Sequence, residues 1–291
     1  MLLRVQDVDL YYVHRLHPKV PVEQQAAAML AVKEAGLARH IGVSEFSPKN
    51  LELFHAVCPV TTVQQEWSLI NRDLEEDLLP ACRRLGVGVV AYSPLSRSIL
   101  SDEVVDAGKT TRQLAGDAAD VRAARYPRLS EENLPKNAAL ARGVRALAKE
   151  RGLSLAQLSL AWVASQGEDV VPIPGTTKIS HLEDNAKAMG VVLTSEESAL
   201  VRAAVPADKV VGARFAAAAH CPCSASIYFY WPWTRWYVGV LGRVNVRACM
   251  RACVCECVRA CVSAAIVKSA SVCFCVCMPV CIYASVRIRC A

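Results

Sequence analysis

The feature that most constrains the fold of this chain is a regular alternation of short apolar runs with amphipathic helical patterns. Each run consists largely of strand-forming residues. The runs are VDLYYV (8–13), HIGVSEF (40–46), TTVQQEW (61–67), VGVVAYS (87–93) and DVVPIP (169–174). Strands that are apolar almost throughout and alternate with helices predict a parallel sheet covered by helices, which is an α/β fold.

Helical patterns occupy the segments between these runs. In residues 21–36 the apolar side chains recur on one helix face, and Gly36 is suited to end the helix. Residues 73–86 show a second such face, and Asp73 is predicted to cap its start. Both patterns predict helices that lie with one face on the sheet.

Two capping boxes are predicted to open later helices. In a capping box a serine hydroxyl accepts from a backbone N–H three residues on, and the side chain there bonds back. The pairs are Ser154 with Gln157 and Ser180 with Glu183.

Polar residues follow the apolar runs, at the carboxyl ends of the predicted strands. They are His14, Ser44 and Glu45, Gln64, Tyr92 and Ser93, and Gly175 and Thr176. No GxGxxG motif follows the first run, so the usual dinucleotide fingerprint of an open doubly wound sheet is missing. In a (β/α)8 barrel, ligands bind at the carboxyl ends of the strands. The pattern therefore favours the (β/α)8, or TIM-barrel, form of the α/β class.

The segment IPGTTKISHLEDN (173–185) has the composition of an anion site. Gly175 allows close approach of backbone, two threonines supply hydroxyls, Lys178 adds charge, and a helix is predicted to open near Ser180. The alternative is a capped helix after a tight turn with an exposed lysine. Because the segment follows the last predicted strand, where barrels often bind phosphate, we favour a phosphate site.

Six segments, in this order and spacing, carry a family resemblance. They are DLYYVHR, IGVSEFS, VQQEWSL, GVVAYSPLSRSIL, RYPRLSEENLPKN and VPIPGTTKISHLEDN. The sequence resembles the aldo-keto reductases, and within them the plant and bacterial type that reduces aldehydes and ketones with NADPH. The resemblance covers about residues 1–215. It implies that this stretch is an incomplete barrel, strands 4–8 with their helices, in which VDLYYV is the fourth strand.

The resemblance also implies a chemistry. In this family a reduced nicotinamide delivers hydride to a carbonyl carbon, while a tyrosine gives a proton to the carbonyl oxygen. A lysine paired with an aspartate lowers the pKa of that tyrosine. A histidine at the end of the fourth strand orients the carbonyl, and His14 matches it. Taken without the resemblance, His14 is an ordinary strand-end histidine, with Arg15 packing or pairing behind it.

The resemblance implies a set of residues that hold NADP(H). The positions that hold the nicotinamide carboxamide are matched by Ser44, Glu45 and Gln64, and the aromatic on the nicotinamide face by Tyr92. The loop that wraps the pyrophosphate is matched by Ser93, Pro94, Leu95 and Arg97, and the segment around the 2′-phosphate by Gly175, Thr176, Thr177 and Lys178. The arginine and adenine contacts beside that phosphate are matched by His181, Asp184 and Asn185.

Two of these residues depart from the family pattern. Glu45 replaces the common asparagine, and a carboxylate cannot donate to the carboxamide oxygen, so Ser44 or Gln64 must do so. His181 replaces the frequent arginine, so recognition of the 2′-phosphate falls more on Lys178. We expect NADP(H) to be preferred to NAD(H).

The family's catalytic aspartate, tyrosine and lysine belong to strands that precede the fourth. We therefore expect this chain to lack carbonyl reductase activity by itself. The alternative function is a non-catalytic NADP-binding pseudoenzyme or interaction module. The resemblance does not identify the carbonyl substrate, and nothing in the sequence indicates the oligomeric state.

Composition divides the chain into two predicted regions, the partial reductase barrel (1–215) and a Cys-rich tail (216–291). Residues 1–215 hold 25 Lys and Arg against 26 Asp and Glu, whereas the tail holds 8 against 1. The near-neutral barrel region gives no reason to expect nucleic-acid binding. It contains only Cys58 and Cys82, which suits a reducing cytoplasm, and no metal site is expected there.

The tail contains twelve of the fourteen cysteines, many in CxC spacing. One interpretation is a metallothionein-like thiolate cluster, although the spacers are bulky and apolar. Another is a membrane span over 269–286, which is uncharged but contains Pro279. We favour a third, an irregular segment encoded by simple repeats, because repeated GTGC in DNA encodes Arg-Ala-Cys-Val.

Overall fold

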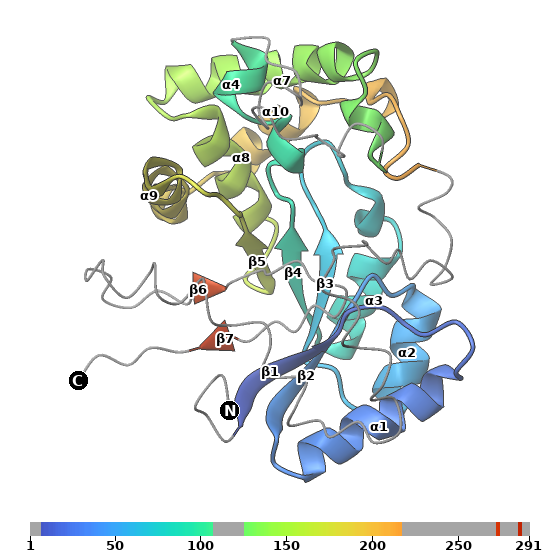
Figure 1. The fold of residues 1–291 in the computed structure, drawn as a ribbon. Coiled ribbons are helices and arrows are strands. Elements are labelled where there is room, and N and C mark those ends of the chain that lie inside the picture. Colours follow the sequence, from blue (N-terminus) through green and yellow to red (C-terminus); the bar gives the residue numbers. More distant parts are fainter. Residues whose placement is uncertain (1–6, 107–124, 217–271, 274–284, 287–291) are drawn as a thin grey trace, which may run out of the picture. The chain divides into compact units, whose positions relative to one another are not determined.

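A computed structural model of the chain describes residues 7–106, 125–216, 272–273 and 285–286 (Figure 1). The chain divides into two compact units. Unit 1 consists of Met1–Thr61 with Pro222–Ala291, and unit 2 of Thr62–Cys221. The predicted tail lies outside the described residues except for Ala216 and two short antiparallel strands, β6 (Val272–Cys273) and β7 (Ser285–Val286).

Unit 1 contains two parallel strands, β1 (Val8–Val13) and β2 (Ala38–Ser44). Helix α1 (Val22–Glu34) connects the strands, and α2 (Pro48–Val57) follows β2. The two helices lie against each other (Figure 1). Because the strands are parallel, their carboxyl ends meet at one edge.

Close packing in unit 1 depends on one residue without a side chain. Gly42 in β2 pairs with Tyr12 in β1. A Cβ atom at Gly42 would lie 2.3 Å from Cε1 of Tyr12, so the tyrosine ring occupies the space that any larger residue would need.

The described part of unit 2 contains three parallel strands, β3 (Thr62–Glu66), β4 (Gly88–Tyr92) and β5 (Val170–Ile173), with β4 between the other two. The register pairs Glu66 with Tyr92 and Tyr92 with Ile173. Side chains alternate between the two faces of a strand. Gln64, Glu66 and Tyr92 therefore project from one face.

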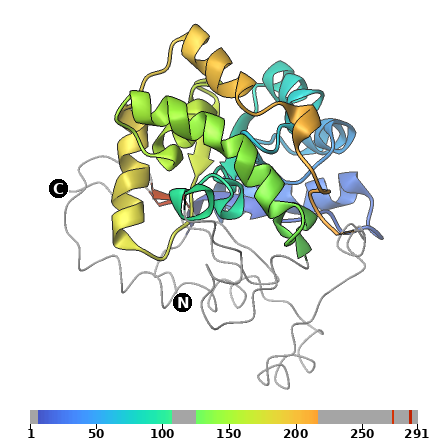
Figure 2. The ribbon, with the colours of Figure 1, turned by 90° about the horizontal axis from the view of Figure 1, so that it is seen from above.

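The helical elements of unit 2 cover its strands and extend from them. Among the described residues they are η1 (Asp73–Glu75), α3 (Leu78–Leu85), η2 (Ser96–Ser98), α4 (Asp102–Val105), η3 (Pro127–Leu129), α7 (Leu134–Glu150), α8 (Leu155–Ala164), α9 (Ile179–Lys187), η4 (Ala188–Gly190), α10 (Ser195–Ala203) and η5 (Ala207–Lys209). α8 contacts β5, α7 and α9, and α10 contacts α7 (Figure 2). Trp162 of α8 is fully buried, and its Nε1 donates to the Ser198 carbonyl oxygen at 3.2 Å.

All five predicted strands are present, as is the helix predicted over 21–36. The single helix predicted over 73–86 is wrong, because Asp73–Glu75 is a 3-10 turn and α3 begins only at Leu78. Pro80 explains the late start. Proline has no backbone N–H, so it is tolerated in the first turn of a helix, where an N–H has no intrahelical acceptor.

The two predicted capping boxes have different outcomes. The box of Ser154 and Gln157 is confirmed at the start of α8. The box of Ser180 and Glu183 is wrong, because α9 begins at Ile179 and Ser180 already lies inside the helix. Instead, the Lys178 backbone N–H donates to Thr176 Oγ1 at 3.1 Å and forms the turn that precedes α9.

Within the described part of the chain, no helix is long and apolar enough to cross a membrane. The same residues contain no group of three or more His, Cys, Asp or Glu side chains placed to hold a metal ion. Most of the cysteine-rich stretch, and most of 269–286, lie outside the described residues.

Candidate functional site

In unit 1, the predicted site residues lie at the carboxyl ends of β1 and β2, where Arg15 links the two strands. Arg15 Nη1 donates to the His14 carbonyl oxygen at 2.7 Å and to Ser44 Oγ at 3.1 Å. Ser44 is buried, and since its oxygen accepts from Arg15, its O–H can donate to another group. Glu45 follows with φ +58°, in the left-handed region. Arg15 therefore joins the backbone of His14 to the side chain of Ser44, and Glu45 follows Ser44 directly.

In unit 2, Gln64 is a buried residue of β3 with an unsatisfied donor. Its side chain is 2% exposed, and Nε2 has no hydrogen-bond partner among the described residues. A buried amide donor without an acceptor carries a desolvation cost of about 1–3 kcal/mol. Buried polar groups of this kind are uncommon in folded proteins and call for an explanation.

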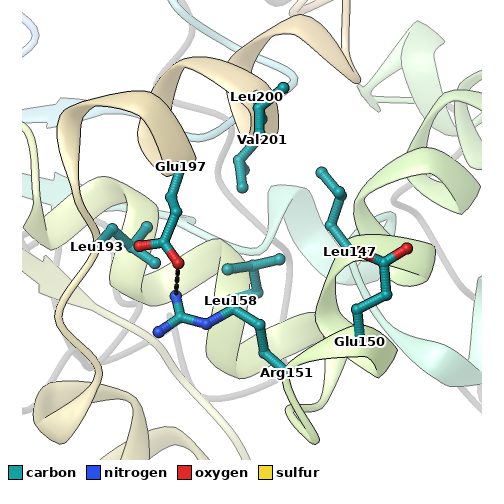
Figure 3. A pocket seen from close by; sticks show the side chains of 8 residues that line it. All are labelled: Leu147, Glu150, Arg151, Leu158, Leu193, Glu197, Leu200 and Val201. Carbon is teal, nitrogen blue, oxygen red and sulfur yellow. Dashed lines mark ion pairs between the residues drawn. The ribbon is translucent and has the colours of Figure 1, made fainter.

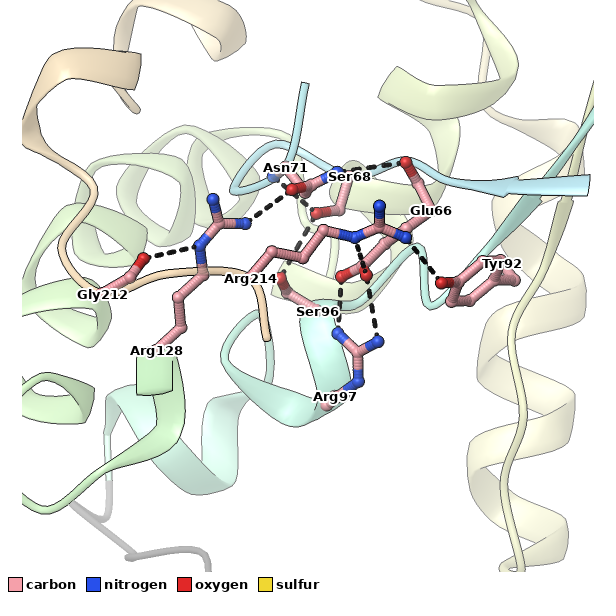
Figure 4. A network of polar contacts seen from close by, with 9 residues as sticks. All are labelled: Glu66, Ser68, Asn71, Tyr92, Ser96, Arg97, Arg128, Gly212 and Arg214. Atoms are coloured by element: carbon pink, nitrogen blue, oxygen red, sulfur yellow. Dashed lines mark hydrogen bonds and ion pairs between the residues drawn. The ribbon is translucent and has the colours of Figure 1, made fainter. Parts of the chain in front are cut away.

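Glu66, two residues further along β3, is a buried carboxylate held by two arginines (Figure 4). Its side chain is 1% exposed. Arg97 contacts it through both terminal nitrogens, Nη1–Oε1 at 2.5 Å and Nη2–Oε2 at 3.0 Å. Arg214 adds Nε–Oε2 at 2.7 Å. Both carboxylate oxygens are thereby satisfied by charged donors.

These contacts fix the charge states of the cluster. Burial by itself would raise the pKa of Glu66, but hydrogen bonds and charges from Arg97 and Arg214 outweigh burial and hold that pKa below its ordinary value. The pKa of Arg97 is raised, because its bonds to Glu66 outweigh its own burial. All three groups are therefore charged at neutral pH, with one positive charge in excess.

Tyr92, the last residue of β4, is tied to the same cluster. Arg214 Nη2 donates to Tyr92 Oη at 2.7 Å. The Arg214 guanidinium also lies 4.8 Å from the centre of the Phe215 ring, and that of Arg97 lies 3.9 Å from the centre of the Tyr126 ring. Such cation–π contacts hold the flat guanidinium groups in place.

The loop after β4 has an unusual backbone. Among the described residues, the non-glycine residues with positive φ are Glu45, Ser93, Ser96, Arg97 and Ser98. Four of the five lie in this single loop, which also contains the predicted site residues Pro94, which is buried, and Leu95. Backbone held in the left-handed region by non-glycine residues is strained, and such strain concentrates at functional sites.

A framework of polar contacts lies beside this loop (Figure 4). Arg128 Nη1 donates to Asn71 Oδ1 at 2.7 Å, and Arg128 Nε donates to the Gly212 carbonyl oxygen at 3.2 Å. Asn71 Nδ2 donates to the Glu66 backbone oxygen at 3.2 Å. Burial lowers the pKa of Arg128.

The predicted anion corner follows β5, beside the loop that follows β4. The segment from Gly175 to Lys178 is exposed. Lys178 Nζ forms an ion pair with Glu103 Oε1 of α4 at 2.8 Å. Since β4 and β5 are paired, both loops lie at the same edge of the strands in unit 2.

The three residues predicted at the arginine and adenine contacts lie on α9, in different settings. His181 is exposed, whereas Asn185 is buried. Asp184 accepts from Ser154 Oγ at 2.6 Å and from Gln157 Nε2 at 2.8 Å. Both carboxylate oxygens of Asp184 therefore fasten α9 to the start of α8, a structural role that the sequence analysis did not assign.

Sequence reasoning missed Glu66, Arg128 and Arg214. Glu66 carried a usable signal, because a carboxylate two residues from Gln64 on a buried strand must face the same side and needs a cation. Arg214 carried none, since it lies 148 residues from Glu66 in the sequence.

A separate pocket of about 180 Å³ lies among α7, α8 and α10 (Figure 3). Leucines and Val201 line it, together with Glu150, Arg151 and Glu197. Arg151 Nη1 and Glu197 Oε1 are 3.3 Å apart. None of the predicted site residues lines this pocket.

The sequence and the architecture of this chain are both similar to those of known proteins. The model of the Aldo/keto reductase family matches residues 2–206. A probable aldo-keto reductase 1 from Glycine max is 42% identical over 214 residues, which are 73% of this chain and 59% of the relative. The chain thus spans less than two thirds of the length of this relative.

Solved structures show the same relationship. The glycerol dehydrogenase of Gluconobacter oxydans matches with a TM-score of 0.61 and 30% identity, over 69% of this chain and 59% of that one. An aldo/keto reductase from Klebsiella pneumoniae, in complex with NADP and acetate, matches with a TM-score of 0.54 and 25% identity, over 74% and 64%. The parallel α/β architecture and the matched segments therefore place this chain in the aldo/keto reductase family.

Proposed function

We propose that this chain binds NADP(H) at the carboxyl ends of its strands and belongs to an enzyme that reduces a small aldehyde or ketone. The Klebsiella pneumoniae structures contain NADP in one case and NADPH in another, which supports this choice of cofactor. The same proposal divides the chain between residues 215 and 216 into a reductase region and a tail. It also includes a cytoplasmic location.

The observation that carries the proposal is the strained loop after β4. Ser93, Ser96, Arg97 and Ser98 have φ values from +50° to +83°. Each such residue costs about 1–3 kcal/mol, so the surrounding structure must hold the loop in place. The Arg97–Glu66 bonds do this. A loop fixed in advance at a strand end is suited to wrap a pyrophosphate, the role that the resemblance gives it.

The residues present fit the nicotinamide end of the cofactor. Gln64 Nε2 is a buried donor with no partner among the described residues, and a carboxamide oxygen is an acceptor of the required kind. When bound, the reduced nicotinamide supplies the hydride. The roles of His14, Ser44 and Glu45 in unit 1, as carbonyl-orienting and carboxamide-holding residues, are proposed from the resemblance.

The corner after β5 fits the phosphate on the adenosine. Lys178 adds a positive charge, and the threonines before it add hydroxyl donors. Glu103 now pairs with Lys178, so a 2′-phosphate would compete with this carboxylate for the ammonium group. We expect NADP(H) to bind more tightly than NAD(H) because NAD(H) offers no such phosphate.

Turnover needs more than these residues. In the family, the proton comes from a tyrosine assisted by a lysine and an aspartate, and none of the matched segments supplies them. We propose that the 291-residue chain binds the cofactor but does not reduce carbonyls by itself. A non-catalytic NADP-binding module, the alternative function, would behave in the same way.

One titration series tests the proposal. NADPH fluorescence is followed as the purified 291-residue chain is added, and NADH is titrated in parallel. Saturable binding of NADPH, weaker binding of NADH and no oxidation of NADPH with 4-nitrobenzaldehyde are expected. Absence of NADPH binding would refute the proposed function, and rapid turnover of the aldehyde would refute the proposed lack of catalysis.

A further inference from the structure

The last described segment of unit 2, residues 211–216, is firmly attached to the rest of that unit. Asn137 is fully buried and bonds the Val211 backbone twice, accepting from its N–H and donating to its oxygen, both at 3.0 Å. The Ala216 N–H donates to the Arg125 oxygen at 3.0 Å. A Cβ atom at Gly212 would lie 2.9 Å from the Arg128 nitrogen, so the backbone passes in close contact there.

Arg214 projects from this attached segment and has two partners that matter to the site. It donates to Glu66 Oε2 and to Tyr92 Oη, each at 2.7 Å (Figure 4). Its side chain is only 14% exposed. Because the two donors are on one rigid, planar guanidinium, their bonds fix the position of the Tyr92 hydroxyl relative to the Glu66 carboxylate.

Glu66 connects this arginine to the strained loop. The same carboxylate that orients Arg214 also binds Arg97 through two bonds. The tyrosine ring at the end of β4 and the loop that follows it therefore depend on one buried anchor.

We propose that Arg214 is a positioning residue that sets the orientation of the Tyr92 ring for stacking on the nicotinamide, with Glu66 as its anchor. The inference rests on the proposed function, because Tyr92 receives its stacking role from the resemblance. Arg214 itself touches neither the cofactor nor the substrate in this scheme and acts through the tyrosine hydroxyl.

The test compares two ligands of the full chain. NADPH contains the nicotinamide, whereas adenosine 2′,5′-bisphosphate contains only the phosphate-bearing adenosine. Arg214→Gln is expected to raise the Kd for NADPH about tenfold, the scale of a lost charge-assisted hydrogen bond, and to leave the bisphosphate Kd within about twofold. Arg214→Lys, which keeps the charge, is expected to give a smaller rise. Arg142→Gln, at an exposed position of α7, is the matched control and should change neither Kd.

A double-mutant cycle tests the route of the effect. Tyr92→Phe removes only the hydroxyl, and the double variant with Arg214→Gln should bind NADPH no more weakly than Arg214→Gln alone. Additive losses, or equal losses for NADPH and the bisphosphate, would overturn the positioning role. If the unmodified chain binds the bisphosphate but not NADPH, this inference fails as well. Failure of the unmodified chain to bind either ligand refutes the proposed function before any variant is made.

Discussion

Glu66 is a buried carboxylate with two guanidinium partners, and its neutralisation should cost far more than loss of a surface ion pair. Glu66→Gln leaves Arg97 and Arg214 buried without a counter-charge. We expect the free energy of unfolding to fall by about 3–5 kcal/mol, as when one partner of a buried pair is removed. Urea unfolding measures it. Glu132→Gln, which breaks the exposed pair with Lys136, is the control and should cost less than about 1 kcal/mol.

The same carboxylate predicts how stability depends on pH. Its pKa is lower in the folded chain than its ordinary value of about 4.3, so the stabilisation is complete above that value and is lost as the pH falls through the folded pKa. Between about pH 4.3 and the folded pKa, the unmodified chain should lose stability more steeply than Glu66→Gln. Parallel acid-unfolding profiles for the two proteins would contradict the assigned ion pairs.

Cys82 is expected to be an unreactive thiol. Burial, with Asp169 nearby, raises its pKa to about 12, so the thiolate that reacts with alkylating reagents is scarce. Iodoacetamide at pH 8, followed by peptide mass mapping, should leave Cys82 unmodified in the folded chain and modify it in urea. Rapid labelling of folded protein would show that the residue is accessible and ionised.

At the scale of the element, the β1–β2 pair depends on Gly42. Gly42→Ala would force its methyl group into the Tyr12 ring, and we expect a loss of about 1–3 kcal/mol, the usual cost of overpacking. Gly190→Ala is the control, because a Cβ there meets nothing within 4 Å and the glycine φ is not positive. Thermal unfolding of both variants distinguishes a steric effect from a general effect of removing glycine.

Glycine at position 98 should relieve the backbone strain in the loop after β4. Ser98 has φ +83°, a conformation that glycine adopts without strain, so Ser98→Gly is expected to stabilise the chain by about 0.5–1 kcal/mol. Ser195→Gly, in the first turn of α10, should destabilise instead, because glycine is a poor helix former. Denaturant titration provides both values, and destabilisation by Ser98→Gly would argue against the strained backbone.

The presence of each strand was easier to predict than the residue at which each helix begins. Among the described residues, apolar runs located the five parallel strands, β1 to β5, because a strand buried on both faces has a distinctive composition. Helix starts failed at Asp73 and Ser180, where Pro80 and the turn made by Thr176 override the local capping pattern. Both errors arise from competing local bonds that a pattern of residue types does not rank.

At the scale of the whole molecule, the sequence predicted the strand ends that form the candidate site. It did not predict the long-range ion pairs that hold their side chains in place. The places of Tyr92 and Gln64 on strands could be predicted from the apolar runs, whereas their cofactor roles come from the resemblance and stay predictions. Arg214 could not, since its bond to Glu66 joins segments 148 residues apart and has no local signature. Long-range ion pairs are decided by tertiary structure, and no pattern within a short stretch of sequence encodes them.

The shared carboxylate has a consequence for how this family can vary. Loss of the carboxylate at position 66 leaves two buried guanidinium groups without a counter-charge, so both arginines should be retained only where position 66 is acidic. Among related proteins, those without an acid at the position of Glu66 are expected to lack one or both arginines. An alignment in which these positions varied independently would show that natural selection does not treat them as one unit.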